Sequence, residues 1–77
     1  MKVELRLYAS LARYMPKQKG SKLLDVREGT TLRGLLEQLD VPLRSVKILF
    51  LNGVHAEGNE PLKDGDRVGV FPPVAGG

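Results

Sequence analysis

Thr31-Leu32-Arg33-Gly34-Leu35-Leu36-Glu37-Gln38-Leu39 carries the clearest helical pattern in this chain. Its four leucines recur at i, i+3, i+4 and i+7, which places them on one face of an α-helix. Thr30 or Thr31 can cap the first turn with its side-chain oxygen, and Pro42 cannot continue a helix. The pattern predicts one amphipathic helix whose apolar stripe must pack against another layer.

Strand-like segments lie on both sides of this helix. Residues 2–8 alternate between polar and apolar side chains, as a half-buried strand does, and a short helical stretch at 9–14 leads to a second strand at 22–28. The remaining strands are predicted at 46–51, 54–56 and 67–71, the first two joined by a tight Asn52-Gly53 turn. A mixed sheet covered on one face by one main helix is an α+β domain of the β-grasp type.

Length and composition limit what the chain can do alone. Its 77 residues are enough for one domain, and they include no cysteine for a disulfide or a thiolate metal site. The net charge of +3 is modest, and the basic cluster at 17–22 lacks the stacking aromatics of a nucleic-acid surface. No apolar run approaches the roughly 20 residues that cross a bilayer. We expect a cytoplasmic protein that binds neither nucleic acid nor membrane.

The side chains form no recognisable catalytic or metal site. His55 is the only histidine, and a solvated strand residue is its simplest interpretation. Asp64 and Asp66 bracket a glycine, which suits a turn and falls short of a calcium loop. A phosphate-binding glycine loop is also missing. We therefore expect a partner or carrier with no active site, metal or bound cofactor of its own.

The sequence ends on Pro72-Pro73-Val74-Ala75-Gly76-Gly77. Proline cannot donate to a sheet ladder, so the proline pair ends the last strand, and glycines without side chains can enter a narrow slot. Residues 73–77 could reach roughly 16 Å beyond a domain formed by residues 1–72. Such a tail suits delivery of a terminal carboxylate to another protein's active site, although an arbitrary Gly-Gly end is more simply a frayed terminus.

One face of the predicted sheet has no helix to cover it. If Ile48 and Phe50 point toward the helix, Leu49 and Leu51 point away from it. An exposed apolar patch is typical of a docking surface, so both leucines are candidate docking residues. They could instead pack under the loop of residues 57–66.

Phe71 is a third candidate docking residue. Val68 and Val70 are expected to face inward, which leaves Phe71 outward at the base of the tail.

Two segments together identify a family. The C-terminal segment contains Leu62-Lys63-Asp64-Gly65-Asp66-Arg67-Val68 and ends on the proline pair, Val74, a small residue and Gly76-Gly77. The N-terminal segment is Leu5-Arg6-Leu7-Tyr8-Ala9-Ser10-Leu11. Both resemble the MoaD/ThiS sulfur carriers, and the similarity extends over essentially the whole chain. The resemblance implies a ubiquitin-like β-grasp fold.

The same resemblance implies a role for Gly77. In this family a ubiquitin-activating-like adenylyltransferase, of the ThiF or MoeB-like type, uses ATP to join AMP to the terminal carboxylate of the carrier. A sulfur donor such as a cysteine desulfurase then displaces AMP and leaves a thiocarboxylate. ATP is used by the partner, so the carrier itself needs no cofactor.

The proline pair makes the tail more similar to the small subunit of molybdopterin synthase than to thiamine carriers. In that role the tail, Pro73, Val74, Ala75, Gly76 and Gly77, would insert into a MoaE-like large subunit and give sulfur to a pterin precursor of the molybdenum or tungsten cofactor. Three alternatives stay open: a sulfur carrier for thiamine or tRNA thiolation, a ubiquitin-like modifier attached through Gly77, and an adaptor with a passive tail.

Overall fold

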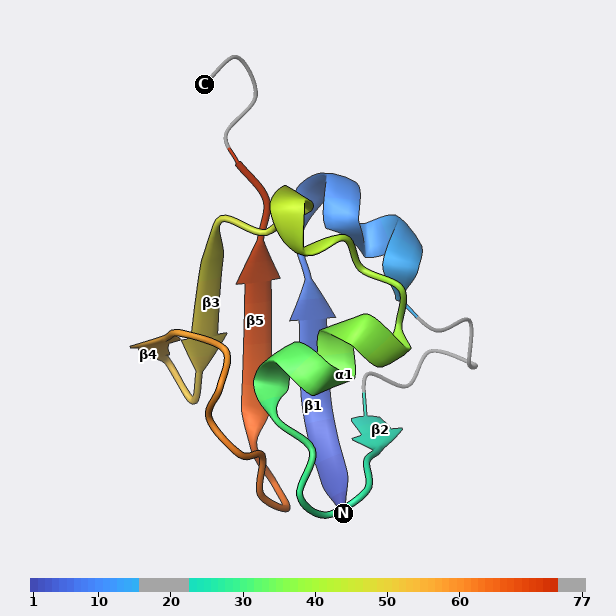
Figure 1. Cartoon of the computed structure of the whole chain (residues 1–77), viewed down its shortest axis with the longest axis vertical. Helices are drawn as coiled ribbons and strands as arrows, with labels where there is room; N and C mark the ends of the chain where they lie inside the picture. The colour runs from blue at the N-terminus through green and yellow to red at the C-terminus, as the bar shows by residue number, and fades with distance from the viewer. Residues whose placement is uncertain (16–22, 74–77) are drawn as a thin grey trace.

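The computed structural model describes residues 1–15 and 23–73, which form a mixed sheet with one α-helix packed across it (Figure 1). The strands are β1 (Lys2–Leu7), β2 (Leu23–Asp25), β3 (Ile48–Leu51), β4 (Val54–Ala56) and β5 (Arg67–Phe71). The helices are the α-helix α1 (Leu32–Gln38) and the 3-10 helices η1 (Ala9–Tyr14) and η2 (Leu43–Ser45). This is the predicted ubiquitin-like β-grasp arrangement.

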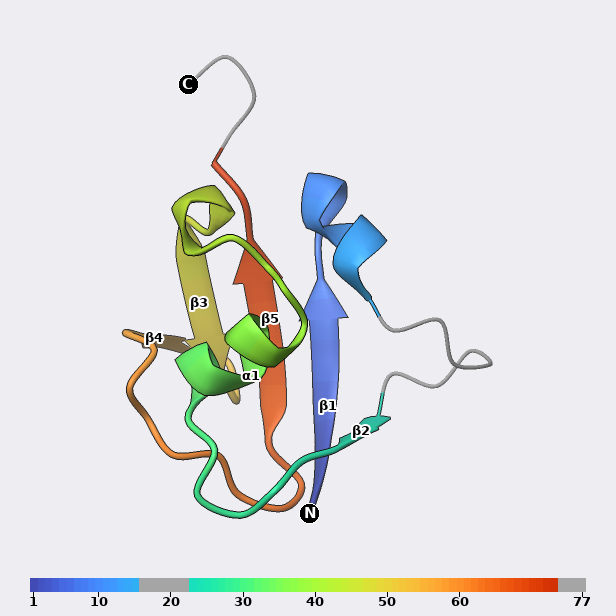
Figure 2. The same ribbon diagram turned by 45° about the vertical axis from the view of Figure 1, so that its right-hand side comes forward.

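The last strand in the sequence is the middle strand of the sheet, whose order is β2-β1-β5-β3-β4. β5 runs parallel to β1 and antiparallel to β3, and the two outer pairs are antiparallel. Because β1 and β5 are parallel, η1 follows β1 at the end of the sheet where the chain leaves β5. η2 lies at that end too, just before β3 (Figure 2).

Aliphatic side chains fill the space between the sheet and α1. The helix contributes Leu32, Leu35 and Leu36, each at most 2% exposed. The hydroxyl oxygen of Thr31 accepts a hydrogen bond from the amide of Gly34 at 3.0 Å, so Thr31 is the N-cap. A Cβ at position 34 would lie 3.2 Å from that hydroxyl, so glycine leaves room for the cap.

The loop before β5 holds the start of α1. The amides of Leu32 and Arg33 donate to the carbonyls of Glu60 and Gly58, at 3.0 and 2.8 Å. These bonds satisfy amides that have no partner inside the helix. The Glu60 carboxylate accepts hydrogen bonds from the amides of Glu57 and Gly58, which lowers the pKa of Glu60.

Several element boundaries differ from the prediction. α1 ends at Gln38, well before Pro42, because Asp40 adopts a left-handed conformation with φ of 60°. β3 starts two residues later than predicted because η2 precedes it, and β2 spans only three residues. The Asn52-Gly53 turn is confirmed, with φ values of 54° and 82°. The predicted basic cluster at 17–22 lies outside the described residues.

The predicted orientation of β3 is wrong. Leu49 is paired with Val70 and Leu51 with Val68, and both valines are buried under α1. The two leucines pack against the same core. Their selection as docking residues on the open face therefore has no structural basis, and Phe50 faces that side in their place.

Replacing Leu36 with alanine tests the core. Leu36 is fully buried, so Leu36→Ala should lower the free energy of unfolding by about 2–5 kcal/mol in urea denaturation. Leu43→Ala removes the same atoms from a side chain that is 41% exposed and should cost less than roughly 1 kcal/mol. Equal losses in the two variants would contradict the packing of α1 on the sheet.

Candidate functional site: the base of the C-terminal tail and the open face of the sheet

Hydrogen bonds on both sides hold β5 up to its last residue. The amide of Tyr8 donates to the carbonyl of Val70 at 3.0 Å, and the amide of Lys47 donates to the carbonyl of Phe71 at 2.8 Å. Pro72 and Pro73 have no N–H to extend the ladder. The backbone therefore leaves the sheet directly after Phe71, as the sequence predicts.

The predicted tail residues Val74, Ala75, Gly76 and Gly77 lie outside the described residues, whereas Pro73 is described and exposed. Their insertion into a partner stays a prediction. So does the division of the chain into a domain of residues 1–72 and a tail of residues 73–77.

Phe71 lies on the open face of the sheet, as predicted, between two other aromatic rings. The Tyr8 ring stacks on it with ring centres 4.2 Å apart and planes 3° from parallel. Phe50 meets Phe71 edge-on at 5.8 Å, and His55 meets Phe50 edge-on at 6.0 Å. These four residues form an aromatic row that crosses from the end of β1 over β5 and β3 to β4.

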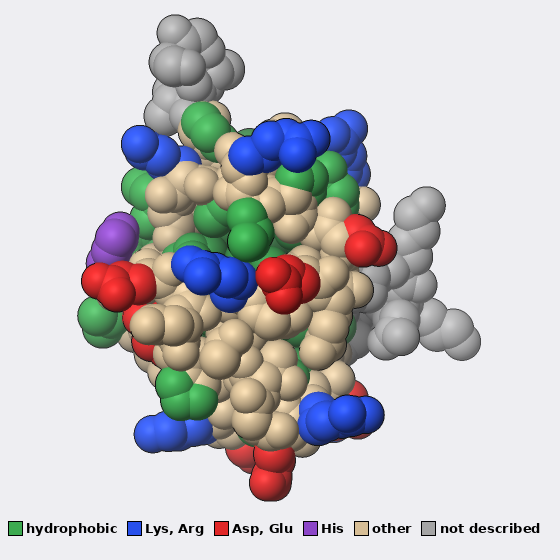
Figure 3. Space-filling view, viewed as in Figure 1, with side chains coloured by type: hydrophobic (Ala, Val, Ile, Leu, Met, Phe, Trp, Pro, Cys, Tyr) green, Lys and Arg blue, Asp and Glu red, His purple; other side chains and the backbone are tan. Residues whose placement is uncertain are grey.

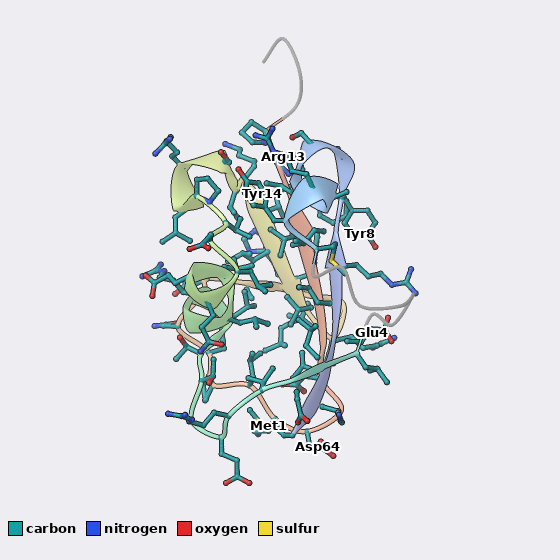
Figure 4. The ribbon with its side chains drawn as sticks, turned by 90° about the vertical axis from the view of Figure 1, so that its right-hand side faces the viewer. Met1, Glu4, Tyr8, Arg13, Tyr14 and Asp64 are labelled. Atoms are coloured by element: carbon teal, nitrogen blue, oxygen red, sulfur yellow. The ribbon has the colours of Figure 1, made fainter. Side chains whose placement is uncertain are left out.

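Tyr8 and Phe50 were not predicted as site residues. Tyr8 continues the alternation of β1 on its polar side, and Figure 4 shows it with Glu4 on the side of the sheet away from α1. This alternation could have indicated that Tyr8 lies on the open face of the sheet. Phe50 was predicted to face the helix. Every residue of β3 is apolar, so the sequence of this strand does not indicate which of its side chains face α1.

A shallow depression of about 420 Å³ lies on the open face beside Phe71. Tyr8, Phe50 and Phe71 supply its apolar walls, and Arg6 and Arg67 stand among its lining residues. The Nε atom of Arg6 donates to Glu4 at 3.0 Å, and this contact raises the pKa of Arg6. The opposite face, which carries α1, shows charged side chains of both signs with only small apolar areas between them (Figure 3).

Within residues 1–15 and 23–73, no three His, Cys, Asp or Glu side chains gather closely enough to hold a metal ion. The only histidine, His55, packs on the edge of the aromatic row. The helices in the same ranges are all too short or too polar to span a membrane.

A model of the ThiS family matches residues 6–77. The chain belongs to the ThiS family. The match reaches from β1 through the Gly76-Gly77 end, so it includes both the open sheet face and the tail. No curated protein sequence matches the chain closely enough to count as a relative.

Solved structures of similar proteins share the fold of this ThiS-family chain. Small archaeal modifier protein 1 from Haloferax volcanii is 27% identical over 95% of this chain and 98% of that one, with a TM-score of 0.69. A Pyrococcus furiosus protein assigned as subunit 1 of a molybdopterin converting factor is 28% identical over the same shares, 95% and 98%, with a TM-score of 0.68.

A third similar structure is a complex of subunits 1 and 2 of the molybdopterin-converting factor from Helicobacter pylori. The matching chain is 30% identical, both chains are covered completely, and the TM-score is 0.60. MoaD-like proteins of this fold thus form complexes with a second subunit. The family comprises small ubiquitin-like sulfur carriers or modifiers, which act as carriers or subunits of larger assemblies.

The stacking of Tyr8 on Phe71 should be measurable as a coupling energy. In a double-mutant cycle, Tyr8→Ala and Phe71→Ala should together show a coupling of about 0.5–1.5 kcal/mol in the free energy of unfolding. Val54 lies on β4 and is 68% exposed, so pairing Val54→Ala with Phe71→Ala should give almost no coupling. Additive effects of Tyr8→Ala and Phe71→Ala would contradict the stacked pair.

Proposed function

We propose that this ThiS-family chain is a sulfur carrier whose Gly77 carboxylate is activated by an adenylyltransferase and converted to a thiocarboxylate. The observation that carries the proposal is the family match, which continues to Gly77 beyond a strand that ends at Phe71. The hydrogen bonds to Val70 and Phe71 hold β5 in the sheet up to its last residue, and the proline pair has no N–H to extend the ladder, which supports a tail that starts after this strand.

Activation is chemically necessary because a free carboxylate is a poor electrophile. A carboxylate oxygen of Gly77 attacks the α-phosphorus of ATP, and pyrophosphate leaves. A donor that supplies sulfur at the oxidation level of sulfide then attacks the acyl carbon, and the C–O bond to AMP breaks as the C–S bond forms. The product is a soft, anionic nucleophile that can pass its sulfur to an acceptor. The catalytic groups and ATP belong to the partner enzymes.

The favoured acceptor is a pterin precursor of the molybdenum or tungsten cofactor, reached in complex with a MoaE-like large subunit. The similarity to the Pyrococcus furiosus and Helicobacter pylori subunits supports this choice. A second candidate function is that of a protein modifier joined through Gly77 to a lysine. Its support is the similarity to the Haloferax volcanii modifier protein.

Mass spectrometry of the protein purified from its own cells tests the role of Gly77. The mature chain should end at Gly77, and a fraction of it should be heavier by the difference between a sulfur and an oxygen atom. Deleting Gly77 should abolish this species and the function while leaving the melting temperature unchanged, because the described sheet and core are formed by residues up to Phe71. Full function of a chain that retains an extra alanine after Gly77 would reject the proposal and leave an adaptor with a passive tail.

The acceptor can be identified with the same material. Sulfur transfer to a pterin precursor by the chain and a purified large subunit supports the molybdopterin role. Isopeptide adducts between Gly77 and lysines of other proteins support the modifier role.

Phe71 is proposed to dock this carrier on the partners that receive the tail. Phe71→Asp should weaken the affinity for the activating enzyme at least about tenfold, which calorimetry can measure, with a modest loss of stability because Phe71 is only half-buried. Val54→Asp makes the same kind of change at an exposed residue of β4 and should bind normally. Equal affinities for the two variants would remove Phe71 from the docking surface.

A further inference from the structure

Gly69 stands at the centre of the open face. It lies in the middle strand of the sheet, opposite Arg6 on β1 and Phe50 on β3. Arg67 and Phe71, two residues before and after it on β5, project on the same side. A position without a side chain is therefore ringed by long ones, and this produces the depression of about 420 Å³.

No feature of the backbone requires glycine at position 69. Gly69 is not among the glycines with positive φ, so its conformation is open to other residues. A Cβ built there would lie 3.7 Å from Tyr8 Cε2 and 3.9 Å from Phe50 Cβ, both ordinary van der Waals distances. Glycine in a strand interior weakens the strand, whereas a β-branched residue would favour it. The hollow is thus kept at a cost in strand stability.

The walls and the rim of the hollow differ in chemistry. Tyr8, Phe50 and Phe71 provide aromatic walls, which suit an apolar side chain. Arg6 is paired with Glu4, but Arg67 makes no ion pair with any residue in the described parts of the chain. Glu4 lies opposite Arg67 in the β1–β5 register, but its carboxylate is bonded to Arg6, so the guanidinium of Arg67 can pair with a carboxylate from outside.

We propose that this hollow, the Gly69 socket, receives one large apolar side chain of the activating enzyme, with an acidic side chain beside it that pairs with Arg67. The socket is defined by Gly69, Arg67 and the walls Tyr8, Phe50 and Phe71. This inference rests on the proposed function, because it names the surface by which the carrier is held during activation of Gly77.

The position of the socket next to the tail favours the activating enzyme as the protein that binds there. Phe71 is both a wall of the socket and the last strand residue before the tail, so a protein that takes up the tail covers the socket. Each of the carrier and modifier roles considered above begins with activation of the Gly77 carboxylate. The activating enzyme is therefore the partner that all these roles share.

Filling the socket tests the apolar part of the inference. Full-length chains with Gly69→Ala or Gly69→Val are compared with the native chain as substrates of the activating enzyme from the same organism, with pyrophosphate release as the readout. We expect Gly69→Val to raise KM at least about tenfold and Gly69→Ala to raise it less, with kcat at saturating carrier unchanged within about twofold. Melting temperatures should not fall, because alanine fits the site and valine favours strands.

Charge reversal tests the acidic part. Arg67→Glu should raise KM and weaken the dependence of KM on salt, because one attractive pair across the interface is replaced by repulsion. Arg27→Glu makes the same change in charge at an exposed residue after β2, at the far end of the sheet from the tail, and should leave KM close to the native value.

The outcomes separate the socket from the proposed function. If the native chain is activated and a folded Gly69→Val chain shows the same KM and kcat, the socket is overturned and the proposed function stands. If Arg67→Glu and Arg27→Glu have the same KM, the proposed pairing of Arg67 with an acidic side chain of the activating enzyme is rejected. If the native chain is not activated at all, both the proposed function and the activating enzyme as the partner of the socket are rejected. A native dimer in sedimentation that Gly69→Val converts to monomers would make a second copy of the chain the occupant and overturn the inference.

Discussion

The parallel pairing of β1 with β5 is the interaction on which this structure depends. It joins the two ends of the described chain at the middle of the sheet, and it sets Leu5 beside Val68 and Leu7 beside Val70 in the core. The same register carries Tyr8 to the level of Phe71 on the other face. One pairing therefore builds the inner layer under α1 and the aromatic contact at the base of the tail. A shift by one residue would exchange the two faces and destroy both.

The sheet is covered on one face and open on the other because the domain is small. A chain of 77 residues without cysteine has a core worth only a few kcal/mol, and all three leucines of α1 are buried in it. The described residues include one α-helix, and it covers one face of the sheet. The other face keeps its aromatic side chains at the surface, next to the point where the chain leaves the sheet. The buried core and the exposed aromatic row thus lie on opposite sides of the same five strands.

Much of the fold could be predicted from local signals, and the misses have physical causes. The leucine spacing of α1 and the Asn52-Gly53 turn are properties of neighbouring residues, so both are confirmed. The phase of β3 was not predictable, because Ile48–Leu51 is apolar on both sides and only pairing with β5 decides which residues face α1. Phe71 was found from the alternation of β5. The hollow at Gly69 was not predicted, because it depends on residues of two other strands that lie beside Gly69 only in the folded sheet.

The stacked pair of Tyr8 and Phe71 has a practical consequence for magnetic resonance. Ring planes 3° from parallel at 4.2 Å place the protons of each ring in the shielding region of the other, so their signals should shift upfield of ordinary aromatic positions. Only two tyrosines and two phenylalanines contribute aromatic ring signals of these types, which keeps the spectrum simple. The protein thus contains a native label at the base of its tail, and any macromolecule that separates or covers the two rings can be detected without attaching a probe.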